Sequence, residues 1–257
     1  MSAQQTSQPP THPVLFVGAG PGSADLLTLG AAKAITEADV ILHDRLVGAE
    51  VLALASRRAT VLEVGKEGFG KAIPQDRISA LIVAFGLSGR RVVRLKSGDS
   101  GIFGRLDEEL DALAAVGLTW TILPGITSAA AAAATIGQSL TRRGRNGSLR
   151  IVTGHDAEGF AEQDWRSLAR AGEVAAIYMG KRAARFVQGR LMMHGADPAT
   201  PVTIVENASR ADERIHPATL ATLPAVAEGV QGPAVILYGL APRRAAEALP
   251  QLREGLA

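Results

Sequence analysis

A glycine-rich segment near the start of the chain has the form of a ligand-binding turn. Gly18-Ala19-Gly20-Pro21-Gly22 follows the apolar run 14–17 and precedes a helical pattern over 26–35. Glycines at a strand-to-helix turn let the backbone turn tightly and approach a ligand closely. The dinucleotide fingerprint has a third glycine where this chain has Ser23, and Pro21 removes an N–H that a pyrophosphate could use. Alone, the segment leaves a nucleotide site and a ligand-free turn open.

Arginines gather in one short segment of the second half of the chain. Residues 141–150 contain Arg142, Arg143, Arg145 and Arg150. Arginine binds a carboxylate through two parallel hydrogen bonds, so such a segment suits a substrate with many carboxylates. Basic runs are more often solvated loops, and the pattern alone favours that interpretation.

Other charged residues have two interpretations each. Asp44 and Arg45 follow a predicted strand and can either reach a cleft or form a local surface ion pair of little energetic value. Lys66 is either a proton-handling group or an ordinary exposed lysine. Glu108 and Glu109 fall in the first turn of a predicted helix, where acids interact favourably with the helix dipole. We expect Glu109 to do only that.

Composition excludes several classes of protein. There is no cysteine, and the five histidines are scattered, so we expect no disulfide and no metal site. A net charge of +2 does not indicate nucleic-acid binding. No apolar run reaches the roughly 18 to 20 residues that span a bilayer. Residues 1–13 lack the regions of a secretory signal, so we expect a cytoplasmic protein that does not bind membranes.

The chain alternates apolar runs with helical patterns, which predicts an α/β protein with mostly parallel, helix-covered sheets. Aromatic residues are only 4% of the chain, so its core must be aliphatic. The predicted strands are 14–17, 40–42, 60–64, 91–95, 119–123, 149–153, 174–179, 202–205 and 234–238. The predicted helices are 26–35, 48–56, 78–85, 106–115, an alanine-rich one after Pro124-Gly125, 165–169 and 183–194.

Pro124-Gly125 separates two series of these elements. We therefore expect a first domain over 14–124 and a second over 125–243. Residues 1–13 are expected to be a disordered lead-in, and 244–257 a tail.

Five further segments follow the glycine turn in a fixed order. They are His43-Asp44-Arg45-Leu46-Val47, Val64-Gly65-Lys66, residues 93–99 with Phe103-Gly104-Arg105, Pro124-Gly125-Ile126-Thr127-Ser128 and Leu140-Thr141-Arg142-Arg143. With this set the chain resembles the tetrapyrrole methylases from about Val14 to Leu240. The Asp44 to Val47 segment and Gly104-Arg105-Leu106-Asp107-Glu108-Glu109 resemble the uroporphyrinogen-III C-methyltransferases within that superfamily.

The resemblance implies two α/β domains with an active-site cleft between them, and a homodimer. It implies that S-adenosylmethionine binds in the cleft. It also implies methylation of uroporphyrinogen III at carbons 2 and 7, which gives precorrin-2 by way of precorrin-1, and S-adenosylhomocysteine. Dehydrogenase and chelatase modules are fused to some family members, and we expect a partner to supply those steps.

The resemblance also assigns residues. The implied cofactor contacts are Pro21, Ser97, Gly98, Asp99, Ile102, Thr127, Ser128, Met179, Ala208, Pro233 and Ala234. The implied catalytic residues are Asp44, Lys66, Arg105 and Glu108. The implied substrate contacts are Arg45, Arg105, Arg142 and Arg143.

The chemistry of the implied reaction indicates which of these residues can accept a proton and which can only stabilise charge or hold substrate. A sulfonium donor is already activated, so transfer needs no metal and no protein nucleophile. A ring proton must be lost after transfer, and Asp44 is our first choice of general base. Arginine stays protonated at ordinary pH, so we expect Arg105 to stabilise charge or hold substrate.

Three other functions stay open from the sequence. Ser97-Gly98-Asp99-Ser100-Gly101-Ile102 and Thr141-Arg142-Arg143 depart from the commonest family pattern, and the first resembles later corrin-ring methylases. A dinucleotide-dependent oxidoreductase with a degenerate fingerprint is the second alternative. A non-catalytic binding module for S-adenosylmethionine or a tetrapyrrole is the third.

Overall fold

The computed structural model describes residues 12–65, 73–156 and 158–243. The chain divides into two compact units between Thr127 and Ser128. Lys66, most of the predicted lead-in and the whole predicted tail lie outside the described residues. Among those described, no helix is long and apolar enough to cross a membrane.

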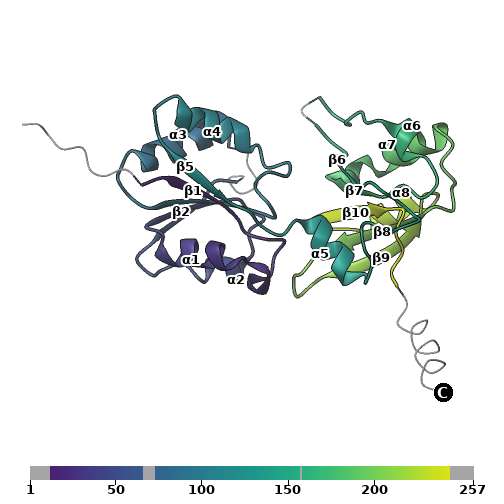
Figure 1. Ribbon diagram of the computed structural model, residues 1–257, viewed down its shortest axis with the longest axis horizontal. Helices are drawn as coiled ribbons and strands as arrows, with labels where there is room; N and C mark the ends of the chain where they lie inside the picture. The colour runs from purple at the N-terminus through teal and green to yellow at the C-terminus, as the bar shows by residue number, and fades with distance from the viewer. Residues whose placement is uncertain (1–11, 66–72, 157, 244–257) are drawn as a thin grey trace, which may run out of the picture. The chain divides into compact units, whose positions relative to one another are not determined.

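The first unit is built on a parallel sheet of five strands in the order β3-β2-β4-β1-β5. Its strands are β1 (Val14–Gly18), β2 (Val40–His43), β3 (Thr60–Glu63), β4 (Val92–Lys96) and β5 (Trp120–Leu123). Its helices are α1 (Leu29–Glu37), α2 (Ala49–Leu52), α3 (Gln75–Gly86) and α4 (Leu106–Ala114), with a 3-10 turn over Ala24–Leu26. Helices α1 and α2 cover one face, and α3 and α4 cover the other (Figure 1). The predicted parallel α/β architecture is confirmed for this unit.

The burial pattern of the strands explains this two-sided packing. Successive side chains of a strand point to opposite faces of its sheet. Accordingly, Ile41 packs with Ile35 of α1, whereas its neighbour Leu42 packs with Ile82 of α3. Every residue of β4 is buried, so this strand has no solvent face.

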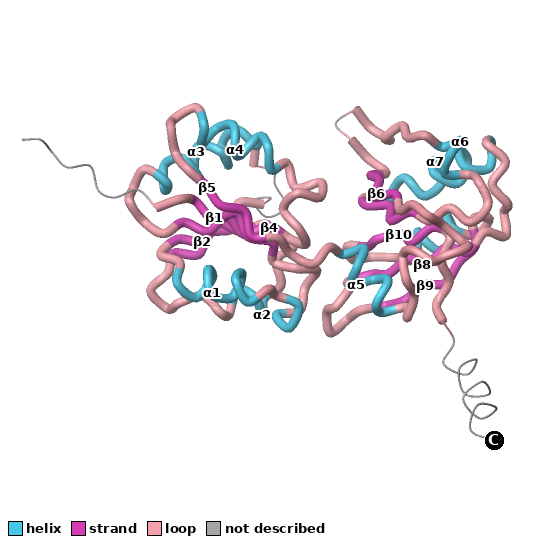
Figure 2. The backbone as a smooth tube through the Cα atoms, viewed as in Figure 1, coloured by secondary structure: helices cyan, strands magenta, loops and turns pink. Residues whose placement is uncertain are grey.

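The second unit has a sheet in the order β6-β7-β10-β8-β9. Its strands are β6 (Arg150–Thr153), β7 (Ala175–Tyr178), β8 (Pro201–Glu206), β9 (Arg214–Thr219) and β10 (Ala234–Tyr238). Its helices are α5 (Ser128–Thr135), α6 (Trp165–Leu168), α7 (Gly180–Met193) and α8 (Leu223–Glu228). Helix α5 packs on one face and α6 and α7 on the other (Figure 2). Helix α8 packs in the same core cluster as α6 and α7.

The prediction of a mostly parallel sheet is wrong for this second unit. Only β6 and β7 are parallel, while β10 runs antiparallel to β7 and to β8, and β8 runs antiparallel to β9. The sequence did not indicate β9, because this edge strand is polar and largely exposed. Pro217 lies within it, as an edge strand allows. When β9 is not predicted, the antiparallel hairpin that it forms with β8 is missed as well. The strands that are predicted then resemble the alternating strands and helices of a parallel sheet.

Three turns at the carboxyl end of the first sheet pack backbone against backbone. A Cβ atom on Gly18 would lie 2.5 Å from the backbone nitrogen of Gly125. A Cβ on Gly125 would overlap the carbonyl oxygen of Gly98. Gly20 and Gly98 exchange two backbone hydrogen bonds of 3.1 and 2.7 Å. These glycines therefore let the segments after β1, β4 and β5 meet.

We expect Gly125→Ala to lower the free energy of unfolding by about 1 to 3 kcal/mol, because the added methyl group meets backbone atoms that cannot rotate away. Thermal or denaturant unfolding measures the change. Gly147→Ala is the matched control, since no atom lies within 4 Å of a Cβ there. Equal effects of the two substitutions would contradict the close packing of the three turns.

Candidate functional site

The strand order of the first unit creates a switch point at the carboxyl edge of its sheet. Strands β1 and β4 are neighbours, yet the helices that follow them, α1 and α4, pack on opposite faces of the sheet. In open α/β sheets, ligands bind outside the carboxyl ends of the strands at such a switch point. The segments with Pro21 and with Ser97 to Ile102 follow these two strands. The structure therefore brings these predicted cofactor residues to one edge.

Asp99 holds this edge together. Its Oδ2 accepts a hydrogen bond of 2.9 Å from the backbone N–H of Gly125, and its Oδ1 accepts one of 2.9 Å from Gly101. The carboxylate thus ties the turn after β4 to the segment after β5, which leads to Thr127. Pro21 is buried beside these turns, whereas Ser97 and Ile102 are half-buried.

The turn after β4 encloses a hollow with an unsatisfied polar atom. The hollow measures about 370 Å³ and is lined by residues from Ser100 to Glu108. Ser100 is fully buried, and its hydroxyl has no hydrogen-bond partner among the described residues. A buried hydroxyl without a partner costs free energy, so it indicates a missing ligand group or water. A larger open groove of about 610 Å³ between α3 and α4 shares only Glu108 with the predicted site.

Backbone strain collects in the predicted binding segments. Among the described residues, the non-glycine residues with positive φ are Phe103, Arg105, Met179, Asn207 and Ser209. Each follows the carboxyl end of β4, β7 or β8, next to residues implied to bind cofactor or substrate. Left-handed conformations cost energy in residues with a Cβ, and they concentrate at functional sites.

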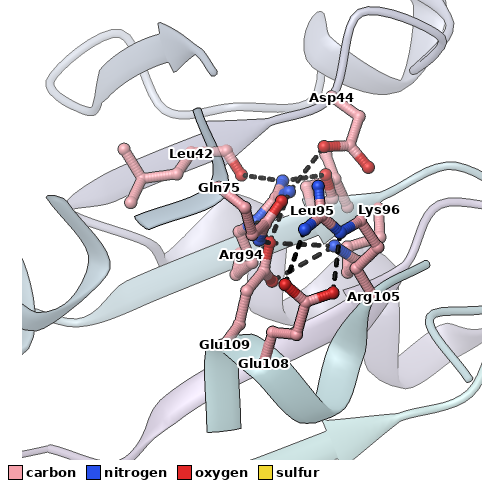
Figure 3. Close-up of polar contacts among 9 residues, drawn as sticks. All are labelled: Leu42, Asp44, Gln75, Arg94, Leu95, Lys96, Arg105, Glu108 and Glu109. Atoms are coloured by element: carbon pink, nitrogen blue, oxygen red, sulfur yellow. Dashed lines mark hydrogen bonds and ion pairs between the residues drawn. The ribbon is translucent and has the colours of Figure 1, made fainter. Parts of the chain in front are cut away.

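Asp44 follows β2 and reaches into a buried charge network (Figure 3). Its Oδ1 accepts a hydrogen bond of 2.5 Å from Nη2 of Arg94, which lies on β4. Arg94 also donates to both carboxylate oxygens of Glu109, and Lys96 Nζ lies 3.1 Å from each of those oxygens. Gln75 Nε2 donates to Glu109 Oε1 over 3.0 Å. Asp44 itself is one-third exposed, so it connects the network to solvent.

Burial and charge act in opposite directions within the network. Burial lowers the pKa of Arg94, but the carboxylates of Asp44 and Glu109 outweigh it and raise that pKa. Burial, followed by the charge of Arg94, lowers the pKa of Lys96.

The expectation that Glu109 serves only the helix dipole is wrong. Its side chain is fully buried and neutralises two buried cations. Arg94 and Lys96 had no assigned role, although a signal was present in the sequence. Two cations that alternate with apolar residues in a strand buried on both faces must find anionic partners.

Arg105 and Glu108 form a different kind of pair. Two hydrogen bonds of 2.7 and 2.6 Å join them, and both side chains are more than half exposed. The hydrogen bond from Arg105 lowers the pKa of Glu108, and Glu108 raises the pKa of Arg105. An exposed ion pair is weak, so both groups can exchange partners with a charged ligand.

Arg45 is exposed near this edge. Gly65 packs against it, because a Cβ on Gly65 would lie 2.9 Å from Cβ of Arg45. The prediction for Lys66 stays untested, since that residue is outside the described part.

The arginine-rich segment of the second unit separates into two pairs. Arg145 donates to Asn146 Oδ1 and to the Ser139 carbonyl, so it shapes the loop. Arg150 lies 3.6 Å from a carboxylate oxygen of Asp164. Arg142 and Arg143 are exposed, and the described residues offer their guanidinium groups no ion-pair partner. These last two are therefore the arginines available to an anionic ligand.

The remaining predicted cofactor residues lie in the second unit. Met179 follows β7, is half-exposed and is the N-cap residue directly before α7. Ala208 follows β8 and is buried. Pro233 lies beside this segment, because the Asn207 N–H donates to its carbonyl over 2.8 Å, and Ala234 pairs with Glu206. Ser128 begins α5.

Glu206 fixes these two segments against each other. Its side chain is 4% exposed, and its Oε1 accepts hydrogen bonds from the backbone N–H groups of Gln231 and Gly232. Its Oε2 lies 3.0 Å from His216 Nε2. The bond from Gly232, with smaller contributions from His216 and Gln231, lowers the pKa of Glu206. No local pattern indicates this role, because the partners of Glu206 are 10 to 26 residues away along the chain.

No group of three or more histidine or carboxylate side chains that could hold a metal ion occurs among the described residues. The described residues present the partly exposed carboxylate of Asp44, exposed arginines and strained backbone turns.

The curated proteins to which this chain is similar include several siroheme synthases. A siroheme synthase of Edwardsiella ictaluri is 44% identical over 226 residues, which are 88% of this chain and 49% of that protein. The chain spans about half the length of the curated relatives it matches.

Solved structures of methyltransferases have a fold similar to that of this chain. A uroporphyrin-III C-methyl transferase from Thermus thermophilus, complexed with S-adenosyl homocysteine, is similar with a TM-score of 0.77 and 36% identity, over 89% of this chain and 97% of that one. A cobalt precorrin-4 methyltransferase of cobalamin biosynthesis gives a TM-score of 0.78 with 26% identity, over 88% and 94%.

The family model described as Tetrapyrrole (Corrin/Porphyrin) Methylases matches residues 13–224. The resemblance predicted from the ordered motifs is thereby confirmed. This chain belongs to the tetrapyrrole methylase family.

Proposed function

We propose that the chain is an S-adenosylmethionine-dependent C-methyltransferase that converts uroporphyrinogen III to precorrin-2 by methylation at carbons 2 and 7. The observation that carries the proposal is the convergence of the turns after β1 and β4 at one sheet edge. The likeness to the Thermus enzyme with bound S-adenosyl homocysteine supports the cofactor. A homodimeric state and a cytoplasmic location stay predictions.

The described residues fit this cofactor in the first unit. The hollow after β4 falls within the roughly 300 to 1,000 Å³ typical of ligand sites. The Ser100 hydroxyl, which no described residue engages, can bond a polar group of the cofactor. Ser97, Gly98, Asp99 and Ile102 are the proposed cofactor contacts of the first unit. Met179, Ala208, Pro233 and Ala234 stay the predicted cofactor residues of the second unit.

Bound S-adenosylmethionine supplies a methyl group already activated on a sulfonium sulfur. The chain must hold the nucleophilic ring carbon in line with that methyl, about 3 to 3.5 Å away. Arg142, Arg143 and the exposed Arg105 bind substrate carboxylates. Asp44 accepts the proton that the ring loses, through Oδ2, which no described residue engages.

A later corrin-pathway methylation is the second candidate function. The likeness to the cobalt precorrin-4 methyltransferase supports it, as does the serine- and glycine-rich segment from Ser97 to Ile102. The two candidates share the cofactor and differ in the ring system that is methylated.

Mass spectrometry of the reaction product tests the proposal. Incubation with uroporphyrinogen III and S-adenosylmethionine is expected to add two methyl groups. Calorimetry is expected to show binding of S-adenosylhomocysteine and none of NAD. A protein that leaves uroporphyrinogen III unchanged but methylates a precorrin would favour the corrin-pathway function. Binding without turnover on any tetrapyrrole would favour a binding module.

We expect the double substitution Arg142→Ala with Arg143→Ala to raise KM for uroporphyrinogen III about tenfold or more. Each lost charge-assisted bond to a carboxylate costs about 1.5 to 3 kcal/mol. Steady-state kinetics measure the change, while the affinity for S-adenosylhomocysteine stays constant. Arg185→Ala is the control, because Arg185 is exposed on α7 and pairs only weakly with Glu228. An unchanged KM in the double variant would argue against this substrate site.

Glu206→Gln is expected to lower the melting temperature at pH 7 and to weaken binding of S-adenosylhomocysteine, because one charged acceptor of three bonds is lost. The pKa of Glu206 in the folded protein lies below its ordinary value of 4.5. Its carboxylate therefore stabilises the fold fully above pH 4.5, and this stability is lost as the pH falls through the lowered pKa. The difference between the two proteins should shrink below pH 4.5 in thermal unfolding. Glu228→Gln, at an exposed site, should show neither effect.

A further inference from the structure

Arg94 has no free nitrogen. Nη1 donates to the carbonyl oxygens of Leu42 and Leu95 over 3.4 and 3.2 Å. Nε donates to both oxygens of Glu109, and Nη2 donates to Glu109 and to Asp44. The guanidinium is planar, so these bonds from three elements fix both its position and its orientation.

The charges of the network balance. Arg94 and Lys96 are cations, and Asp44 and Glu109 are anions. Three of these side chains are at most 3% exposed, while that of Asp44 is 33% exposed. Buried charges are tolerated only when they are paired and hydrogen-bonded. Glu109 therefore secures the two cations, and Arg94 in turn presents one nitrogen to Asp44.

Asp44 is thereby held at both its backbone and its side chain. Its N–H donates to the Leu95 carbonyl over 3.1 Å, which extends the pairing of β2 with β4. Its Oδ1 is held by Arg94, and Oδ2 is left without a bond from any described residue. One oxygen is thus anchored, and the described part of the chain leaves the other open to a substrate.

We propose that Arg94, held in place by Glu109 and Lys96, is a positioning residue that orients the Asp44 carboxylate for proton removal. The proposal rests on the proposed function. Arg94 is 2% exposed and does not reach solvent, so it acts on the reaction only through Asp44. This distinguishes it from Arg105, whose exposed side chain can meet a ligand directly.

A double-mutant cycle on Asp44 and Arg94 tests the proposal. Asp44→Asn removes the base and is expected to lower kcat about 100-fold or more. Arg94→Lys keeps the charge but loses the planar fork, and is expected to lower kcat about tenfold or more. In the Asp44→Asn protein, Arg94→Lys should change kcat by less than about twofold, because its effect passes through Asp44. Additive losses of kcat would overturn the proposal.

Arg91→Lys is a matched control. Arg91 directly precedes β4 and, like Arg94, forms an ion pair with an aspartate. Its guanidinium donates two hydrogen bonds to Asp39 and its backbone N–H donates a third, but the two side chains are 49% and 43% exposed. It is expected to leave kcat unchanged. The affinity for S-adenosylhomocysteine should stay within about twofold in all variants, which reports an intact cofactor site.

A second variant keeps the test decisive if Arg94→Lys does not fold. Lys96→Met combined with Glu109→Gln removes one cation and one anion, so the network stays neutral. Its kcat is expected to fall below that of the unaltered protein, because Arg94 loses the carboxylate of Glu109 and keeps only Asp44 and two carbonyl oxygens. This loss should also vanish in the Asp44→Asn protein, and persistence of the loss would overturn the proposal.

Failure of the proposed function and failure of the positioning role of Arg94 give different results. If the unaltered protein methylates no tetrapyrrole, the proposed function is wrong. If it turns over normally and Asp44→Asn retains full kcat, the function stands and the positioning role of Arg94 is wrong.

Discussion

The ionic contact of Glu109 with Arg94 and Lys96 is the constraint on which the first unit depends. Arg94 and Lys96 lie on a strand that is buried on both faces. Burial of these two cations is tolerated only because the carboxylate of Glu109 pairs with both of them. Helix α4 supplies that anion in its first turn and is therefore fixed over β4. The turn between them, which holds Ser100 and Arg105, is fixed at both ends. Asp44 completes the neutralisation from the end of β2.

At the carboxyl edge of the first sheet, close contacts between backbone segments shape the predicted site. Gly18, Gly98 and Gly125 meet so closely that their missing side chains are replaced by one another's backbone. The glycine turn was expected to let the backbone approach the cofactor. The structure adds a packing role, since the glycines bring three turns together. The left-handed residues Phe103 and Arg105 then give the turn after β4 its shape.

The second unit also brings predicted cofactor residues together, but it does so through antiparallel strand pairing. Strand β10 runs antiparallel to β8, so its start at Ala234 lies beside the end of β8 at Glu206. In a parallel arrangement these two ends would lie at opposite edges of the sheet. The antiparallel pairing therefore brings Pro233 to Asn207, and Glu206 bonds both segments. Predicted cofactor residues that are some 25 residues apart become neighbours in this way.

The sequence by itself determined the family and the parallel sheet of the first unit, because ordered motifs and apolar runs are local patterns. Tertiary structure decided the partners of Glu109, the direction of β10, the presence of β9 and which arginines of residues 141–150 have no ion-pair partner among the described residues. Each of these depends on pairing between distant residues, such as Asp44 with Arg94 across 50 positions. A local pattern shows that a buried charge needs a partner, but only the folded chain brings that partner within hydrogen-bonding distance.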